Sequence, residues 1–278
     1  MSNNRITTST IRARKEAGEA ISMLTAYDAA FARLFDEAGI DMLLVGDSVG
    51  NTMLGYDSTL PVTMEDMLHH VKAVSRGASR AMIVADMPFM SYQTSIAEAL
   101  YNAGRFLKET GAQAVKLEGG AAVSPAVQAM TSAGIPVVGH LGLTPQSVNQ
   151  FGGFKVQAKN AAAAQQLLDD ARLLEKAGAF AVVLECVPAA LAAKVSQALS
   201  IPTIGIGAGN GCDGQVLVMH DLLGLTPGFK PKFVKTYRTL AQEVIAAARE
   251  YADDVKARQF PAAEHTFSVA DEVLEKLY

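Results

Sequence analysis

Five short apolar runs of this chain each end on an ionisable side chain, and this pattern constrains the fold more than any other feature. The runs are LLVGD, MIVAD, AVKLE, PVVGH and AVVLE, which end at Asp47, Asp86, Glu118, His140 and Glu185. Such runs are typical of strands buried on both faces of a parallel sheet. Each is followed by a loop and a helical pattern, so the five residues are expected at the same end of successive parallel strands.

Runs of this kind recur often enough to predict eight strands in the 278 residues of the chain. The predicted strands lie at residues 21–25, 42–47, 82–86, 114–118, 136–140, 181–185, 203–207 and 216–220. Helix-length segments separate most of them, as parallel crossovers require. We therefore expect a single (β/α)8 TIM barrel domain over residues 1–278, with a short N-terminal helix and a C-terminal helical extension.

An open doubly wound sheet is the alternative fold, and it would need a nucleotide-binding fingerprint. The glycine-rich stretch Gly205–Gly211 has Asn210 where the pattern G-x-G-x-x-G needs its last glycine, which disfavours dinucleotide binding. Two interpretations of these glycines stay open. They form either a loop that passes close to a ligand at the barrel mouth or a tight turn without a ligand.

Glycines also punctuate the predicted helices. Gly39, Gly111, Gly134 and Gly178 each follow a helical pattern and precede the next apolar run. Glycine is the residue that most readily adopts the left-handed conformation that ends many helices. These four positions are therefore predicted to be helix caps.

The composition excludes some classes of partner. A net charge of -4 and a pI near 5.8 argue against nucleic acid or an anionic membrane surface, since both need a basic patch. The first residues, MSNNRITTST, lack the apolar region of a secretion signal, and no run of 18 apolar residues occurs, so a cytoplasmic protein is expected. Half of the residues are hydrophobic and only 19% are charged, which predicts a homo-oligomer.

Three acidic residues on different predicted strands, Asp47, Asp86 and Glu118, point to a metal site. A single acidic residue after a strand is more often a helix N-cap or a solvated loop residue. Three at one level of a barrel mouth would repel each other, and a hard cation such as Mg²⁺ removes that repulsion by accepting oxygen ligands. The carboxyl end of the strands is also where barrel enzymes do their chemistry.

Lys116 lies two residues before Glu118 on the same predicted strand, so both side chains should face the same side. Three roles are open for this lysine: an ion pair inside the barrel, a cation that binds a substrate carboxylate, or an imine-forming nucleophile. An imine would need a neutral amine, which the surrounding carboxylates oppose. The carboxylate-binding role is therefore preferred.

Glu185 is the candidate general base. It ends the sixth predicted strand, roughly opposite the second in a closed barrel, and the metal does not need it. His140 and His220 are both predicted to close strands, and their roles stay open. Cys186, which directly follows Glu185, is either a nucleophile or, as we prefer, a buried inert thiol.

Long segments of the chain carry a resemblance to a known family. They are MLTAYD, VGDSVG, GYDSTLPVT, VADMPFMSY, VKLEGG, PVVGHLGLTPQSVNQFGGFKVQ, LECVP, IGIGAGNGCDGQVLVMHDLLGL, PKFVK and EHTF. Together and in order, from about Thr10 to Phe267, they resemble the ketopantoate hydroxymethyltransferase family. The last stretch, SVADEVLEKLY, has no counterpart and is predicted to form a short extra helix.

The resemblance implies a barrel of the phosphoenolpyruvate/pyruvate-like type and a magnesium-dependent reaction. A one-carbon unit would pass from 5,10-methylenetetrahydrofolate to 3-methyl-2-oxobutanoate, giving 2-dehydropantoate in pantothenate biosynthesis. The resemblance implies a metal site at Asp47, Asp86 and Glu118, keto-acid contacts from Asp47, Ser48, Asp86 and Lys116, and a proton acceptor at Glu185. It also implies a large homo-oligomer, and a homodecamer is expected.

The chemistry of the residues fits this assignment. An α-keto acid can chelate Mg²⁺, which makes the hydrogen on its branched carbon removable by Glu185 and stabilises the resulting enolate. Three other readings stay open: a metal-dependent keto-acid lyase on the same barrel, a class I aldolase that uses Lys116, and a non-catalytic metabolite-binding or scaffold protein. A requirement for tetrahydrofolate, borohydride trapping and exchange of the substrate proton would distinguish them.

Overall fold

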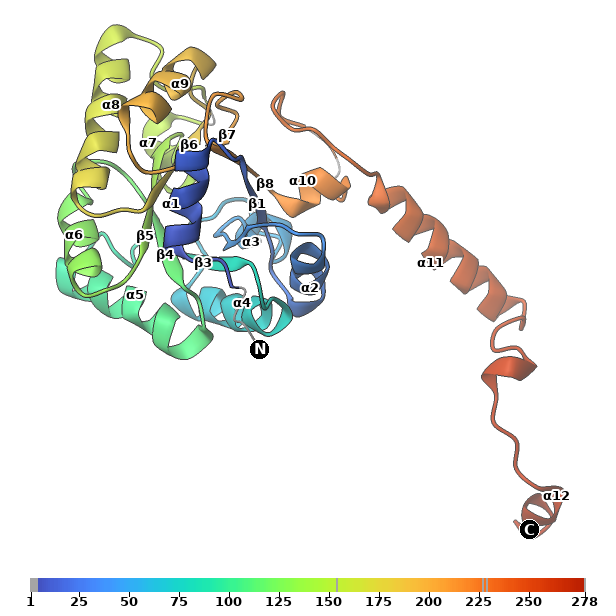
Figure 1. Ribbon diagram of the computed structural model, residues 1–278. Coiled ribbons are helices and arrows are strands. Elements are labelled where there is room, and N and C mark those ends of the chain that lie inside the picture. Colours follow the sequence, from blue (N-terminus) through green and yellow to red (C-terminus); the bar gives the residue numbers. More distant parts are fainter. Residues whose placement is uncertain (1–4, 154, 227, 229, 278) are drawn as a thin grey trace.

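The described part of the chain forms a closed barrel of eight parallel strands (Figure 1). The computed structural model describes residues 5–153, 155–226, 228 and 230–277. The strands follow one another around the barrel in chain order, and the last pairs with the first. They are β1 Ile21–Thr25, β2 Met42–Val45, β3 Met82–Asp86, β4 Ala114–Glu118, β5 Val137–Gly142, β6 Ala181–Glu185, β7 Thr203–Ile206 and β8 Gly214–Leu217. The predicted TIM barrel is thereby confirmed.

Helices cover the outside of the barrel and continue beyond it (Figure 1). Those up to β8 are α1 Thr8–Ala17, α2 Ala29–Glu37, α3 Val49–Thr52, α4 Met64–Gly77, α5 Ile96–Thr110, α6 Ser124–Ser132, the 3-10 helix η1 Pro145–Ser147, α7 Val148–Phe151, α8 Ala161–Lys176 and α9 Ala189–Ala198. After β8 come α10 Met219–Leu223, α11 Leu240–Lys256, η2 Ala263–His265 and α12 Asp271–Leu274. The predicted helix-ending glycines Gly39, Gly111, Gly134 and Gly178 all have positive φ angles, between 83° and 98°.

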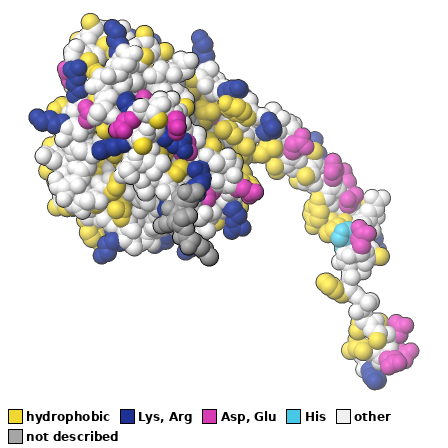
Figure 2. All heavy atoms as spheres, in the orientation of Figure 1, with side chains coloured by type: hydrophobic (Ala, Val, Ile, Leu, Met, Phe, Trp, Pro, Cys, Tyr) yellow, Lys and Arg dark blue, Asp and Glu magenta, His cyan; other side chains and the backbone are white. Residues whose placement is uncertain are grey.

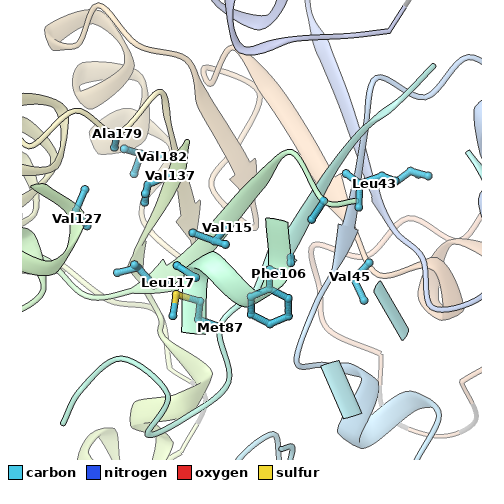
Figure 3. Packing of buried hydrophobic residues seen from close by; sticks show 14 of the residues in the cluster. Leu43, Val45, Met87, Phe106, Val115, Leu117, Val127, Val137, Ala179 and Val182 are labelled. Atoms are coloured by element: carbon cyan, nitrogen blue, oxygen red, sulfur yellow. The ribbon is translucent and has the colours of Figure 1, made fainter. Parts of the chain in front are cut away.

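The strands divide the core into two layers. Val115 and Leu117 of β4 point outward and pack with Leu43, Val45 and Phe106 between the sheet and the helices (Figure 3). Their sequence neighbours point inward, because side chains alternate along a strand. The inner layer is a separate apolar cluster that includes Met42, Met82, Val84, Ala114, Val138, Ala181 and Val183. Its floor is apolar, and the polar residues lie at the carboxyl end above it.

Four of the eight strands, β2, β5, β7 and β8, differ from the prediction at one or both ends, and three of these differences concern Asp47, His140 and His220. β2 ends at Val45, so Asp47 lies two residues beyond it, and β5 continues past His140 to Gly142. β8 ends at Leu217, where its register with Leu24 of β1 stops, so His220 lies on α10 and does not close a strand. A strand ends where its neighbours stop pairing with it, and a single-strand pattern does not contain that information.

The C-terminal part of the chain leaves the barrel as an arm, residues 240–277 (Figure 1). None of the residues of α11 or α12, all of them described, is buried. Figure 2 shows hydrophobic side chains exposed along this arm. The exposed residues of α11 include Val244, Ile245, Tyr251 and Val255. The helix predicted for the last stretch is present as α12. None of the described helices is long and apolar enough to cross a membrane.

Candidate active site

The predicted site residues meet at a cavity of about 210 Å³ at the carboxyl end of the strands. Its walls include every predicted member of the site: Asp47, Ser48, Asp86, Lys116, Glu118 and Glu185. His140 also lines it. Alternation along the strands explains the convergence of Asp86, Lys116, Glu118, His140 and Glu185, since they continue the inward-facing rows that begin at Met82, Ala114, Val138 and Ala181. Asp47 and Ser48 reach the cavity from the segment that follows β2.

The strand register fixes which side chains are neighbours. Asp86 of β3 lies opposite Lys116 of β4, and Glu118 of β4 lies opposite His140 of β5. Glu185 lies opposite Gly142, which has no side chain in the way. A Cβ at Gly142 would come within 2.2 Å of the Glu185 carbonyl oxygen, and its φ of +93° also favours glycine.

Lys116 and Asp86 form a buried ion pair. The Lys116 ammonium lies 2.8 Å from Asp86 Oδ1, without the alignment of a hydrogen bond, and both side chains are at most 4% exposed. Burial disfavours the ammonium, but Asp86, Glu118 and Asp47 outweigh that effect and raise the pKa of Lys116. A lysine held in its charged form is a poor imine nucleophile, which argues against the class I aldolase reading.

Asp47 carries negative charge that its neighbours only partly balance. Its backbone N–H donates to Asp86 Oδ2 at 3.1 Å, and its own Oδ2 accepts from Gln146 Nε2 at 2.9 Å. Burial, then Asp86 and then Glu118, raise the pKa of Asp47 well above its ordinary value, against the opposing effect of Lys116. Burial also raises the pKa of Asp86, where Lys116 opposes the shift and Glu118 adds to it.

The charges of the cavity fit a divalent cation. Five carboxylates line it, those of Asp47, Asp86, Glu118, Glu185 and Asp221, and the cations beside them are Lys116 and His140, so full ionisation leaves three excess negative charges. Asp86 Oδ1 is paired with the Lys116 ammonium at 2.8 Å, so a bound cation would share this carboxylate with the lysine. No group of three His, Cys, Asp and Glu side chains in the described residues is a ready-made metal cage. Mg²⁺ does not need one, because it takes one or two protein carboxylates and completes its shell with water and substrate oxygens.

His140 bridges two of the carboxylates. Its Nδ1 lies 3.3 Å from Glu118 Oε1, and its Nε2 lies 3.2 Å from Glu185 Oε2. Burial and the Lys116 ammonium disfavour the imidazolium, but Glu118 and Glu185 outweigh them and raise the pKa of His140 to about 9. The Glu185 side chain is 17% exposed, whereas that of Glu118 is 3% exposed. Of this pair, Glu185 is therefore the one that a bound substrate can reach.

Ser48 is held at the cavity edge by Tyr27, a residue that the sequence analysis did not identify. The Tyr27 hydroxyl and Ser48 Oγ are 2.8 Å apart, and Tyr27 is fully buried. Gly46 permits this arrangement, since a Cβ there would lie 2.8 Å from Ser48 Oγ. His220 does not line the cavity: it packs beside the Tyr27 ring, with 5.7 Å between the ring centroids.

The structure favours a turn without a ligand for the glycine-rich stretch and an inert thiol for Cys186. Within Gly205–Gly211 only Ile206 lines the cavity. Gly207 and Gly209 have φ angles of +64° and +78°, so the glycines serve the turn. Burial and then Glu185 raise the pKa of Cys186 to about 11, which favours an inert thiol.

Gln146 is the second residue that sequence reasoning missed. It lies on η1, where no periodicity marks it, and only its place in the loop after His140 and Gly142 could have drawn attention to it. It is 4% exposed and contacts both Asp47 and Glu118.

Comparison with solved structures places the fold among known barrels. The chain resembles a phosphonopyruvate hydrolase whose structure is titled as a complex with oxalate and Mg²⁺, with a TM-score of 0.61, 14% identity, and 97% and 94% of the two chains covered. It also resembles 2,3-dimethylmalate lyase, described as a member of the PEP mutase/isocitrate lyase superfamily, with a TM-score of 0.59, 16% identity, and 99% and 94% covered. At such identities the likeness shows the fold alone.

Comparison of sequences is far more specific. The chain is 61% identical over 275 residues to the 3-methyl-2-oxobutanoate hydroxymethyltransferase of Carboxydothermus hydrogenoformans, with 99% and 100% of the two chains covered. It is 63% identical over 263 residues to the enzyme of the same name from Syntrophus aciditrophicus, with 95% and 97% covered. A sequence model described as ketopantoate hydroxymethyltransferase matches residues 5–263. The chain therefore belongs to the ketopantoate hydroxymethyltransferase family of enzymes.

Proposed function

We propose that this enzyme transfers a hydroxymethyl unit from 5,10-methylenetetrahydrofolate to 3-methyl-2-oxobutanoate and so makes 2-dehydropantoate for pantothenate biosynthesis. The names of its relatives support the keto acid as substrate. The observation that carries the chemistry is the cavity in which, on full ionisation, Lys116 and His140 leave three negative charges unbalanced beside an accessible Glu185.

A divalent cation, with Mg²⁺ as the first choice, belongs to this proposal. Asp47 and Asp86 would hold it, with Glu118 close by, because burial and neighbouring carboxylates raise the pKa of both aspartates, and a cation bound there would offset the cost of ionising them. Bound there, the cation would supply a Lewis acid for the keto acid's carbonyl and carboxylate oxygens. Lys116 would keep Asp86 ionised, and its ammonium together with Ser48 Oγ would bind the substrate carboxylate.

Glu185 acts as the base in this proposal. It takes the C3 proton, and the electron pair of that C–H bond becomes the C2–C3 double bond of an enolate. C3 then forms a bond to the methylene carbon as one of its C–N bonds to the folate breaks, and the oxygen of water replaces the second C–N bond and becomes the hydroxyl. Tetrahydrofolate is released with the protons from C3 and from water on its two nitrogens. His140 Nε2, 3.2 Å from Glu185 Oε2, holds this carboxylate in place at the cavity.

Product formation tests this function directly. The purified enzyme with keto acid, methylenetetrahydrofolate and Mg²⁺ should form 2-dehydropantoate, and EDTA should stop the reaction until Mg²⁺ is restored. Cleavage of a keto acid without folate would instead identify the lyase reading. Activity that is unchanged by exhaustive chelation would contradict the role of the cation.

The proposal includes assembly into a homo-oligomer. The arm supports it, since Val244 and Tyr251 of α11 are 60% and 59% exposed in the single chain, and a second copy of the chain would bury them. The expected size is a decamer. Sedimentation should give an oligomer for the native protein and a smaller species for the variant Val244→Asp with Tyr251→Asp. A native monomer would contradict this part of the proposal.

A further inference from the structure

Gln146 stands at the junction of three segments behind the candidate metal site. Its side chain is 4% exposed, and its Nε2 donates to Asp47 Oδ2 and to the Met87 carbonyl oxygen, both at 2.9 Å. Its backbone N–H donates to Glu118 Oε2 at 3.0 Å. One residue therefore binds an oxygen of each of two site carboxylates that come from different strands.

The direction of the Gln146 amide is fixed by its surroundings. The Tyr92 hydroxyl donates to Oε1 at 2.6 Å, and Gln93 Nε2 donates to the same oxygen at 3.3 Å. A flipped amide would set its oxygen against Asp47 Oδ2 and the Met87 carbonyl, which are both acceptors. Both amide hydrogens and the amide oxygen thus have partners in a buried setting, where unpaired polar atoms are costly.

Tyr92 links the Gln146 amide to Glu118. Its hydroxyl oxygen accepts from the backbone N–H of Glu118 at 3.2 Å while its hydrogen goes to Gln146. The contacts form a closed path from Glu118 through Tyr92 to Gln146, and from the Gln146 backbone to the Glu118 carboxylate. Such a path fixes both groups more firmly than separate bonds would.

We propose that Gln146 is a positioning residue that holds the Asp47 and Glu118 carboxylates in place for the divalent cation. The inference rests on the proposed function, and it adds a residue that acts through two carboxylates of the proposed cation site. A neutral amide suits this task because it binds carboxylate oxygens without cancelling the charge that attracts the cation. A cationic side chain at the same place would offset that charge, as Lys116 does at Asp86.

Cation affinity tests the inference more directly than activity does. The dissociation constant of Mn²⁺, followed by its electron paramagnetic resonance signal, and that of Mg²⁺, followed by calorimetry, should rise about 10- to 100-fold in Gln146→Leu, the usual effect of losing a partner of a metal ligand. Leucine keeps most of the volume and removes the donors and the acceptor. The Michaelis constant for the keto acid at saturating metal should change much less.

Gln113→Leu is the matched control. The Gln113 side chain also bonds the backbone, accepting from Ile83 N at 2.7 Å and donating to the Gly111 carbonyl at 2.6 Å, but it lies at the start of β4, away from the cavity. It should lower thermal stability without changing cation affinity. A loss of affinity in this control equal to that in Gln146→Leu would show that general destabilisation is the cause, and would overturn the inference.

Tyr92→Phe supplies a second and milder variant. It keeps the ring and removes the hydroxyl that orients the amide, so cation affinity should fall about 3- to 10-fold, with little further loss when it is combined with Gln146→Leu. Wild-type affinity in a folded Gln146→Leu protein would overturn the inference while leaving the proposed function intact. If Gln146→Leu does not fold, a wild-type cation affinity in Tyr92→Phe would overturn the inference in the same way. Absence of cation binding by the wild type would instead contradict the proposed function.

Discussion

The barrel mouth buries charged side chains, whereas the C-terminal arm leaves apolar side chains exposed. At the mouth, charged side chains such as Lys116 and Asp86 are almost fully buried, because strands on both sides fix their register. In the arm, the apolar residues Val244 and Tyr251 are exposed, although α11 has 17 residues and an ordinary helical pattern. A pattern thus determines the element, whereas neighbouring elements determine what becomes buried.

The largest effect should come from breaking the buried ion pair at the mouth. Lys116→Met leaves the Asp86 carboxylate without its cation, and removing one partner of a buried pair typically costs about 3–5 kcal/mol. Urea unfolding in EDTA should show this loss. Adding Asp86→Asn should restore most of the stability, and a double variant as unstable as the single one would show that the pair is not the cause.

Truncating one residue in a barrel helix and one in the arm compares the two regions directly. Leu174 of α8 is fully buried, so Leu174→Ala should lower the free energy of unfolding by about 2–5 kcal/mol. Val244→Ala in α11 should change it by less than about 0.5 kcal/mol in protein diluted to monomers. An equal loss at Val244 under these conditions would show that the arm packs on its own barrel.

Stability should depend on pH through His140. Its folded-state pKa of about 9 lies above the ordinary value of 6.5, so its stabilising effect is complete below about pH 6.5 and is lost as the pH rises through 9. The shift corresponds to about 3 kcal/mol. Unfolding measured in EDTA should show this decline in the wild type, and His140→Gln should flatten it. The same decline in the variant would assign it to another group.

The smallest effect should distinguish two threonines that begin helices. The Thr63 side chain accepts a hydrogen bond from Asp66 N at 3.1 Å at the start of α4, whereas Thr239 makes no side-chain capping bond at the start of α11. Thr63→Ala should therefore cost about 1 kcal/mol in thermal unfolding. Thr239→Ala should cost a few tenths at most. Equal losses would contradict the capping geometry.

The barrel and most of its candidate site could be predicted from the sequence because side chains alternate between the two faces of a strand. This alternation identifies the buried strands, and it places Asp86, Lys116 and Glu118 on the inward face. Strand ends were less predictable. His140 proved to be inside β5 and His220 on α10, since pairing with neighbouring strands sets these boundaries.

Two features could not be predicted from periodicity at all. Gln146 lies on an irregular turn, and its importance comes from Asp47 and Tyr92, which are 99 and 54 residues away in the chain. The separation of α11 from the barrel depends on what the helix packs against, which its own sequence does not state. Both features follow from contacts between distant segments.

In the proposed reaction, Glu185 removes the C3 hydrogen of the keto acid before the carbon–carbon bond forms. Proton NMR in heavy water, with Mg²⁺ and without folate, measures this step alone. The wild type should exchange the C3 hydrogen of 3-methyl-2-oxobutanoate, and Glu185→Gln should slow the exchange by about 10²- to 10⁴-fold, the range expected for a positioned base. Glu175→Gln, at a carboxylate that binds Ser200 away from the cavity, should exchange at the wild-type rate. Exchange by Glu185→Gln as fast as by the wild type would contradict the account.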